Sequence, residues 1–231
     1  EEAVCREALR LSLKHHRSLA VGLSGVQQQG GIGDIFAQQE SRYQLVNLLE
    51  LDTVIGSGGV LSHAPRRLEA ALMMLDGFEL EGLTEIAVDS IFMMPHLGVL
   101  SEVHPEAAEA IFLKDCLVRI CHAVVPVGAV KLAQGEPLAR VFVDGRELGR
   151  VKRRIVEHHP WDADRSVTIR IEPSSHTIDV GAGPGKPLER NIVTGTEGFI
   201  FDGRGRPIPH ATTASERRAE QRVISTNFGL E

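Results

Sequence analysis

The residues with the clearest chemical potential form a glycine-rich turn, Gly56-Ser57-Gly58-Gly59. A short apolar run precedes this turn and Pro65 opens a helical pattern after it, so residues 51–75 predict a strand, a tight turn and a helix. Such a turn directs backbone N–H groups and the positive end of a helix dipole at one point, where glycine lets a ligand approach the main chain. The pattern predicts an anion site, above all a phosphate site.

The turn by itself leaves two interpretations open, a nucleotide contact and a plain structural turn, because many strand-to-helix turns contain two glycines. Ser57 is not the nucleophile of a Gly-x-Ser-x-Gly elbow, since Ile55 occupies the first glycine position. Gly31-Ile32-Gly33 lacks the third glycine of a dinucleotide fingerprint, and Gly185-Lys186 lacks the other residues of a P-loop. We expect none of these three chemistries.

Several other residues fall at the edge of the predicted sheet where a ligand would lie. Asp89 closes the second predicted strand at the same edge as the glycine turn, since parallel strands align their carboxyl ends. His63 and His96 also follow strand ends at this edge. Met93 and Met94 are more typical of a core, but we hypothesise that they line an adenine slot. The remaining histidines show no metal-binding spacing, so no metal site is predicted.

Composition narrows the classes of function. The chain has 231 residues, of which 42% are apolar and 24% charged, and this balance indicates a soluble globular protein with an ample core. Aromatic residues make up only 4% and the net charge is −6, so nucleic acid is not an expected partner. No apolar run is long enough to span a membrane, and three cysteines fit a reducing compartment. We expect a cytoplasmic protein without a membrane partner.

The elements that position this edge are predicted from periodicity. Helices are expected over about 2–21, 65–76 and 106–113, and a strand over 84–89 completes a parallel β-α-β unit with the glycine turn. Residues 22–39 predict a long loop.

The character changes after Asp115, where short strands alternate with turn dipeptides and predict a compact antiparallel β domain. The expected strands are 117–125, 138–143, 151–157, 167–172, 192–193 and 199–201. A final helix over 215–224 begins at a capping serine. The segment 179–186 predicts a structural turn rich in glycine and proline, and a role in partner or substrate contact stays open.

Two segments about 40 residues apart resemble one known family: residues 51–65 and residues 88–101, the latter followed by His104-Pro105-Glu106-Ala107-Ala108. They resemble the C-terminal half of the MutL/GlmL family, the accessory proteins of cobalamin-dependent mutases, which are unrelated to the mismatch-repair protein of similar name. That family belongs to the actin-like ATPases. It is similar to the diol dehydratase reactivases, chaperones that use ATP to eject damaged cobalamin.

The resemblance implies that Gly56, Ser57, Gly58 and Gly59 form the adenosine-phosphate motif of an actin-like ATPase (ribonuclease H-like) half-domain. It implies ATP or ADP with Mg²⁺ as the cofactor of the full-length parent. The implied partners are an adenosylcobalamin-dependent enzyme and a small second subunit or a homo-oligomer. The family's amino-terminal Asp-x-Gly-Ser/Thr hairpin has no counterpart before Gly56. We therefore expect a fragment of a slow ATPase that lacks catalytic residues and is inactive alone.

These observations lead to one expected organisation of an α/β chain. Residues 1–114 form half of a nucleotide cleft, residues 115–210 a β-rich domain, and residues 211–231 a C-terminal helix and tail. The expected function is that of an ATP-dependent reactivating factor for an adenosylcobalamin-dependent mutase or dehydratase. Two alternatives stay open, a hydantoinase- or sugar-kinase-like enzyme of the same superfamily and a non-enzymatic interaction module that has lost nucleotide binding. Which cobalamin enzyme is served also stays open.

Overall fold

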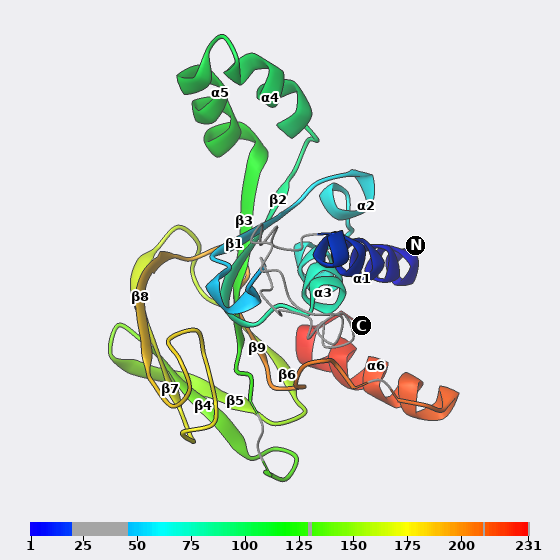
Figure 1. Cartoon of the computed structure of the whole chain (residues 1–231), viewed down its shortest axis with the longest axis vertical. Helices are drawn as coiled ribbons and strands as arrows, with labels where there is room; N and C mark the ends of the chain where they lie inside the picture. The colour runs from blue at the N-terminus through cyan, green and yellow to red at the C-terminus, as the bar shows by residue number, and fades with distance from the viewer. Residues whose placement is uncertain (20–45, 129–130, 210, 231) are drawn as a thin grey trace, which may run out of the picture.

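The computed structural model describes residues 1–19, 46–128, 131–209 and 211–230. Its described part consists of a helical layer, a five-stranded sheet and a four-stranded sheet, with a helical arm that projects from the body (Figure 1). The coarse prediction of a mixed α/β fold is confirmed. The predicted loop over 22–39 lies outside the described residues.

The central sheet has the strand order β1-β2-β3-β9-β6. Its strands are β1 (Thr53–Gly56), β2 (Gly82–Asp89), β3 (Leu117–Val125), β6 (Val156–His159) and β9 (Gly198–Asp202). β1 and β2 are parallel, as the sequence predicted, whereas β3 runs antiparallel to β2. All eight residues of β2 are buried, because neighbours cover both its faces and both its edges.

Helices cover one face of this sheet: α1 (Glu2–Leu19), α2 (Gly59–Ser62), α3 (Arg67–Phe78) and α6 (Ala214–Phe228). The crossover helix α3 is buried on most of its surface, and α1 packs against it. Gly77 permits this close packing, since a Cβ there would lie 2.6 Å from the Cβ of Leu9. The predicted β-α-β unit is confirmed, but its main helix begins at Arg67 because the short helix α2 comes first.

A second sheet packs on the opposite face, with the strand order β5-β4-β7-β8. Its strands are β4 (Pro137–Val143), β5 (Arg146–Lys152), β7 (Ser166–Pro173) and β8 (Leu188–Val193). The side chains between the sheets form one apolar core, which includes Val141, Ile169, Phe199 and Phe201. This core joins the two sheets into a sandwich.

Two predictions about the β-rich segment are wrong in detail. The expected strand over 151–157 is two strands in different sheets, and they are separated by a turn in which Arg154 adopts a positive φ of 61°. The segment is also not purely antiparallel, because β3 pairs with β9 in parallel and shares a sheet with β1 and β2. The division into units at residues 114 and 210 stays a prediction.

A projecting arm, residues 90–116, leaves the sheet between β2 and β3 (Figure 1). It consists of α4 (Met94–Ser101), α5 (Pro105–Ile111) and the π-helical turn η3 (Phe112–Cys116). The amide and the hydroxyl of Ser90 both donate to the carbonyl of Cys116, at 2.8 and 2.9 Å, and close the base of the arm. The helix predicted over 106–113 is confirmed, with the last turn in π geometry.

The remaining elements are short or terminal. A 3₁₀ turn, η2 (Leu48–Glu50), precedes β1. The C-terminal helix α6 is capped by Thr213, whose hydroxyl accepts from the amide of Glu216, and not by the serine that the sequence suggested. In the described part of the chain, no helix is both long and apolar enough to cross a membrane.

Candidate functional site

The glycine turn lies where β1 and β2 end side by side. The two strands are in parallel register with Gly56 opposite Val88, so the turn after β1 meets Asp89 at the end of β2. Gly58 is the N-cap of the short helix α2 and has a φ of 108°, which favours glycine. The first amides of α2 have no acceptor within the helix, so the turn presents backbone donors at the carboxyl edge of the strands.

The three glycines of the turn serve different purposes. A Cβ at Gly56 would lie 2.6 Å from the Sδ of Met74 and 2.9 Å from the Cδ1 of Leu61, so this glycine is required by core packing. A Cβ at Gly58 or at Gly59 would meet no atom within 4 Å. The backbone is therefore open to a ligand at Gly58 and Gly59.

Asp89 connects the turn to the arm. Its Oδ2 accepts from the backbone amide of Met94 at 2.8 Å and from the hydroxyl of Ser57 at 3.4 Å. Its backbone carbonyl accepts from the hydroxyl of Ser62 at 2.6 Å. The side chain of Asp89 is fully buried, and its Oδ1 has no hydrogen-bond partner among the described residues.

The environment of Asp89 favours its charged form. Burial raises the pKa of the carboxyl, but the hydrogen bonds from the amide of Met94 and the hydroxyl of Ser57, with the nearby amides of Met93 and Ile91, outweigh it, so the pKa of Asp89 lies below its usual value. A buried carboxylate with one free oxygen is a ready acceptor for a hydroxyl, a water or a hydrated cation.

A groove with a volume of about 620 Å³ lies beside the turn. Gly59 and His63 line it together with the apolar side chains of Val60 and Met73. The groove is large enough for a small organic group. Glu1 and Glu2 also line it, and their negative charge disfavours a phosphate on that side.

The structure brings together most of the predicted site residues. Ser57, Asp89 and the backbone of Met94 are hydrogen-bonded to one another, and His63 borders the same turn as the C-cap of α2. Met93 packs against the small core of the arm, whereas Met94 is exposed.

His96 stands apart from this cluster. It is exposed on α4, with no contact to the turn among the described interactions. Its predicted place in the cleft stays a prediction.

Sequence reasoning missed the polar residues on the other face of the sheet. Glu85, Arg119 and His122 line a separate cleft between the two sheets, and sequence reasoning took His122 for an ordinary histidine. One signal was present in the sequence, since Glu85 stands in the middle of an apolar strand where a charge requires a partner. Among the described residues, no group of three or more His, Cys, Asp and Glu side chains is placed to hold a metal ion.

Comparison with known proteins identifies one family. The family model described as MutL protein matches residues 1–116, which is half of the chain and includes the glycine turn, Asp89 and the arm. No curated protein and no solved structure matches the chain.

Proposed function

The chain belongs to the MutL family, a family associated with mutases. From this membership we propose that the protein acts as an ATP-dependent accessory, a reactivating factor, of an adenosylcobalamin-dependent mutase or dehydratase. The proposal places the phosphates of an adenine nucleotide on the turn that contains Gly58 and Gly59. It takes β1, α3 and β2 as part of an actin-like nucleotide cleft, which their parallel crossover supports.

One observation carries the nucleotide part of the proposal. Gly59 has a free space where a side chain would stand, although nothing in its own packing requires glycine. Its φ is also one that any residue can adopt, because the positive φ occurs at Gly58 and not at Gly59. Because neither packing nor conformation requires glycine here, the missing side chain is best explained by a phosphate that approaches the backbone closely.

The residues of the turn would share the work of holding the nucleotide. The amides of Gly58 and Gly59 would donate to phosphate oxygens, and the hydroxyl of Ser57 would do the same or remain on Asp89. The groove lined by Val60 and Met73 would take the apolar face of the base. Mg²⁺ would supply the positive charge that lets phosphates lie near the carboxylate of Asp89.

The arm provides a route from the nucleotide to a partner. Asp89 bonds Ser57 on the turn and the amide that begins α4, so a ligand that displaces Ser57 changes a contact at the root of the arm. The nucleotide would act by binding one arrangement of this connection more tightly than another.

The nucleotide site is tested by hydrogen exchange of the backbone amides of residues 56–61, with and without Mg²⁺ and millimolar ATP. We expect ATP to protect these amides in the wild-type chain and to give no protection in Gly59→Val, whose side chain would fill the open space. Gly98→Val is the matched control, because a Cβ at Gly98 also meets no atom within 4 Å and Gly98 lies outside the turn. Protection that persists in Gly59→Val refutes the placement of the phosphate.

The accessory function is tested separately, by the binding of a purified adenosylcobalamin-dependent mutase from the same organism. We expect the affinity to differ between ATP, ADP and no nucleotide. Equal binding in all three conditions would contradict ATP-dependent action and favour a non-enzymatic interaction module.

A further inference from the structure

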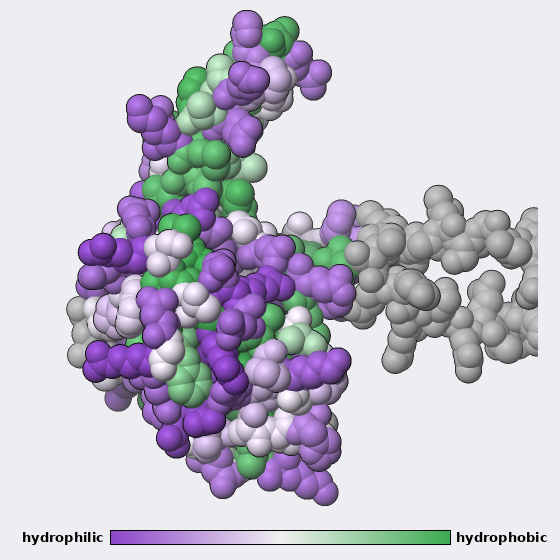
Figure 2. All heavy atoms as spheres, turned by 90° about the vertical axis from the view of Figure 1, so that its left-hand side faces the viewer, coloured by the Kyte–Doolittle hydropathy of each residue, from purple (hydrophilic) through white to green (hydrophobic). Residues whose placement is uncertain are grey.

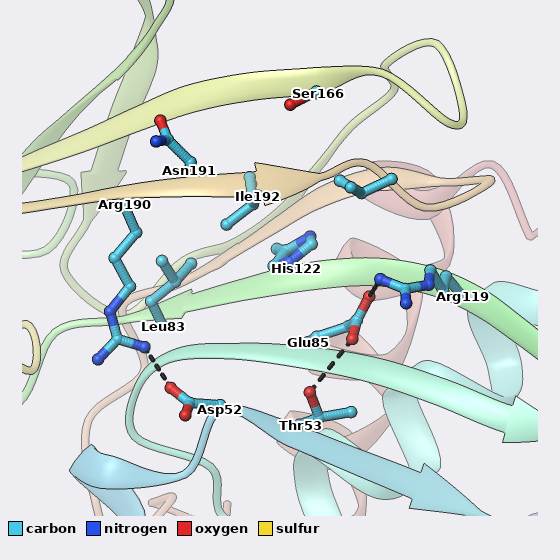
Figure 3. Close-up of a pocket in the computed structure, with 11 residues that line it drawn as sticks. Asp52, Thr53, Leu83, Glu85, Arg119, His122, Ser166, Arg190, Asn191 and Ile192 are labelled. Carbon is cyan, nitrogen blue, oxygen red and sulfur yellow. Dashed lines mark hydrogen bonds and ion pairs between the residues drawn. The ribbon is translucent and has the colours of Figure 1, made fainter. Parts of the chain in front are cut away.

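A second cleft, with a volume of about 460 Å³, lies between the two sheets (Figure 3). It begins at Thr53, the first residue of β1, and so lies at the opposite end of that strand from the glycine turn. Its walls come from β1, β2 and β3 on one side and from β7 and β8 on the other. No part of the proposed nucleotide site lines it.

One row of side chains crosses the floor of this cleft. Thr53, Glu85 and His122 are direct neighbours on β1, β2 and β3. Glu85 is almost fully buried, and both of its oxygens are occupied: Oε1 pairs with Arg119 at 3.1 Å, and Oε2 accepts from the hydroxyl of Thr53 at 3.2 Å. Glu85 therefore needs no further partner.

His122 is the exception in this row. Its side chain is only 5% exposed, and its Nδ1 is buried without a hydrogen-bond partner among the described residues. One face of the ring packs near Phe199, with the centroids 6.2 Å apart. A buried polar atom without a partner is costly, so a small movement of the ring that lets this nitrogen bond a group in the cleft would be favoured.

The cleft offers more donors than acceptors. Arg119 contacts Glu85 through Nη1 and Arg190 pairs with Asp52 through Nη1, and a guanidinium has further N–H groups in a fixed fork. A ligand would therefore bring acceptor oxygens. Leu83 and Ile192 add apolar side chains beside these groups (Figure 3). Val193 also lines the cleft, and this apolar wall suits a short carbon chain.

We infer that this cleft binds a small carboxylate with a short apolar chain. The carboxylate accepts from the guanidinium of Arg119 and from His122, and the chain lies against Leu83 and Ile192. Arg119 and His122 lie three residues apart on β3 and line the same cleft.

The charges around His122 favour a monoanion. The charged side chains that line the cleft are Asp52, Glu85, Arg119 and Arg190, and together they carry no net charge. Burial and the neighbouring Arg119 lower the pKa of His122 to about 4, so the imidazole is neutral at pH 7. One bound carboxylate would raise that pKa, and protonation of His122 would then restore a neutral cleft, whereas a dianion would leave a negative one.

The inference is tested by an NMR titration of the intact chain with sodium butyrate, against sodium chloride at the same ionic strength. The Cε1–H signal of His122 is assigned from its loss in His122→Gln. We expect a saturable shift of this signal and a rise in the pH at which it titrates. Butyramide, which has the same shape without the charge, should cause neither change. An absent shift, or an equal response to butyramide, overturns the inference.

Three variants locate the ligand within the cleft. Arg119→Met should weaken butyrate binding about tenfold or more, because it removes the charged donor. Ile192→Glu, at a partly exposed position, should abolish binding because it places a carboxylate beside the ligand's carbon chain. This second variant keeps the test valid if Arg119→Met, which removes the partner of Glu85, fails to fold. Arg150→Met, on the edge strand β5, is the matched control and should bind normally. Normal binding in a folded Ile192→Glu variant would refute the placement. These results do not depend on whether the glycine turn binds a nucleotide.

Discussion

At the scale of single residues, Gly56 and Gly59 lie in one turn but are subject to different structural constraints. Gly56 is glycine because the core leaves no room for a methyl group, whereas Gly59 faces open space. The two therefore respond differently to the same substitution.

We predict that Gly56→Ala destabilises the fold by about 1–3 kcal/mol, because its Cβ would overlap the side chains of Met74 and Leu61. Gly59→Ala should change the free energy of unfolding by less than about 0.5 kcal/mol, as a surface substitution without new contacts does. Urea unfolding at constant ionic strength measures both. A loss at Gly59 equal to that at Gly56 would show that both glycines serve packing.

The sequence predicted the turn and its neighbour Asp89, but not this difference between the glycines. The position of Asp89 follows from the parallel pairing of two strands, which is a short-range inference. The overlap at Gly56 depends on Met74, which reaches the turn only through the packing of α3 on the sheet. The cleft that contains His122 also depends on long-range packing, because its walls come from strands as far apart in the sequence as Thr53 and Val193, about 140 residues. The sequence therefore did not reveal it.

At the scale of elements, the arm buries few of its apolar side chains and exposes many of them. Its own core consists of Leu97, Ala108 and Cys116 with a few partly buried neighbours. Among the described residues, seven of the twelve exposed large hydrophobic side chains lie in the arm: Ile91, Phe92, Met94, Val99, Val103, Ile111 and Leu113. Figure 2 shows apolar residues at the surface between the body and the tip of the arm.

We predict that the arm opens locally without unfolding of the sheets. Its small core contributes little burial energy, and its two ends are fixed only where β2 and β3 leave the body. Native-state hydrogen exchange should show faster exchange and a weaker dependence on denaturant for the amides of α4 and α5 than for those of β2. Equal protection of the arm and of β2 would contradict this.

Elements were predicted well where local periodicity decides them and poorly where a tertiary contact does. The strands β2 and β3 and the helices α1, α3 and α5 follow from apolar patterns. The break between β5 and β6 does not, because the turn at Arg154 contains neither glycine nor proline and its basic residues also fit an exposed strand edge. The strand leaves one sheet there for the other, which a local pattern cannot specify.

At the scale of the whole molecule, one charged network joins distant parts of the chain. Asp202 at the end of β9 accepts from Arg204 at 2.8 Å and from Arg206 at 2.9 Å, and is fully buried. Arg204 also pairs with Asp76 on α3 at 2.7 Å, and Arg6 on α1 pairs with the same Asp76 at 3.1 Å. The network links the sheet to α1 and α3, two of the helices that cover it.

We predict that Asp202→Asn costs about 3–5 kcal/mol at pH 7, because it leaves buried arginines without their partner. Burial raises the pKa of Asp202, but Arg204 and Arg206 outweigh burial and hold it well below its usual range. A carboxylate whose pKa is lowered in the folded state stabilises the fold fully at pH values above its unfolded-state pKa. This stabilisation is lost as the pH falls towards the folded-state pKa. The wild-type stability should therefore fall more steeply than that of Asp202→Asn below about pH 5.

Urea unfolding between pH 7 and pH 3 measures both the loss and the slope. Glu172→Gln is the control, since Glu172 pairs with two exposed arginines, Arg140 and Arg170, on the surface of the second sheet. Surface pairs of this kind contribute at most about 1 kcal/mol. Parallel pH profiles for the wild-type and Asp202→Asn proteins would show that the network does not govern acid stability.

The burial of β2 on both edges has a consequence for the part of the chain that matches the family. That part ends at Cys116, one residue before β3 begins, yet β3 satisfies the backbone along one whole side of β2. A polypeptide that stopped there would expose a flat apolar ribbon with unsatisfied amides and carbonyls, the kind of surface that recruits other chains into aggregates. The part of the chain that matches the family model therefore depends for its solubility on β3, which lies outside the matched residues.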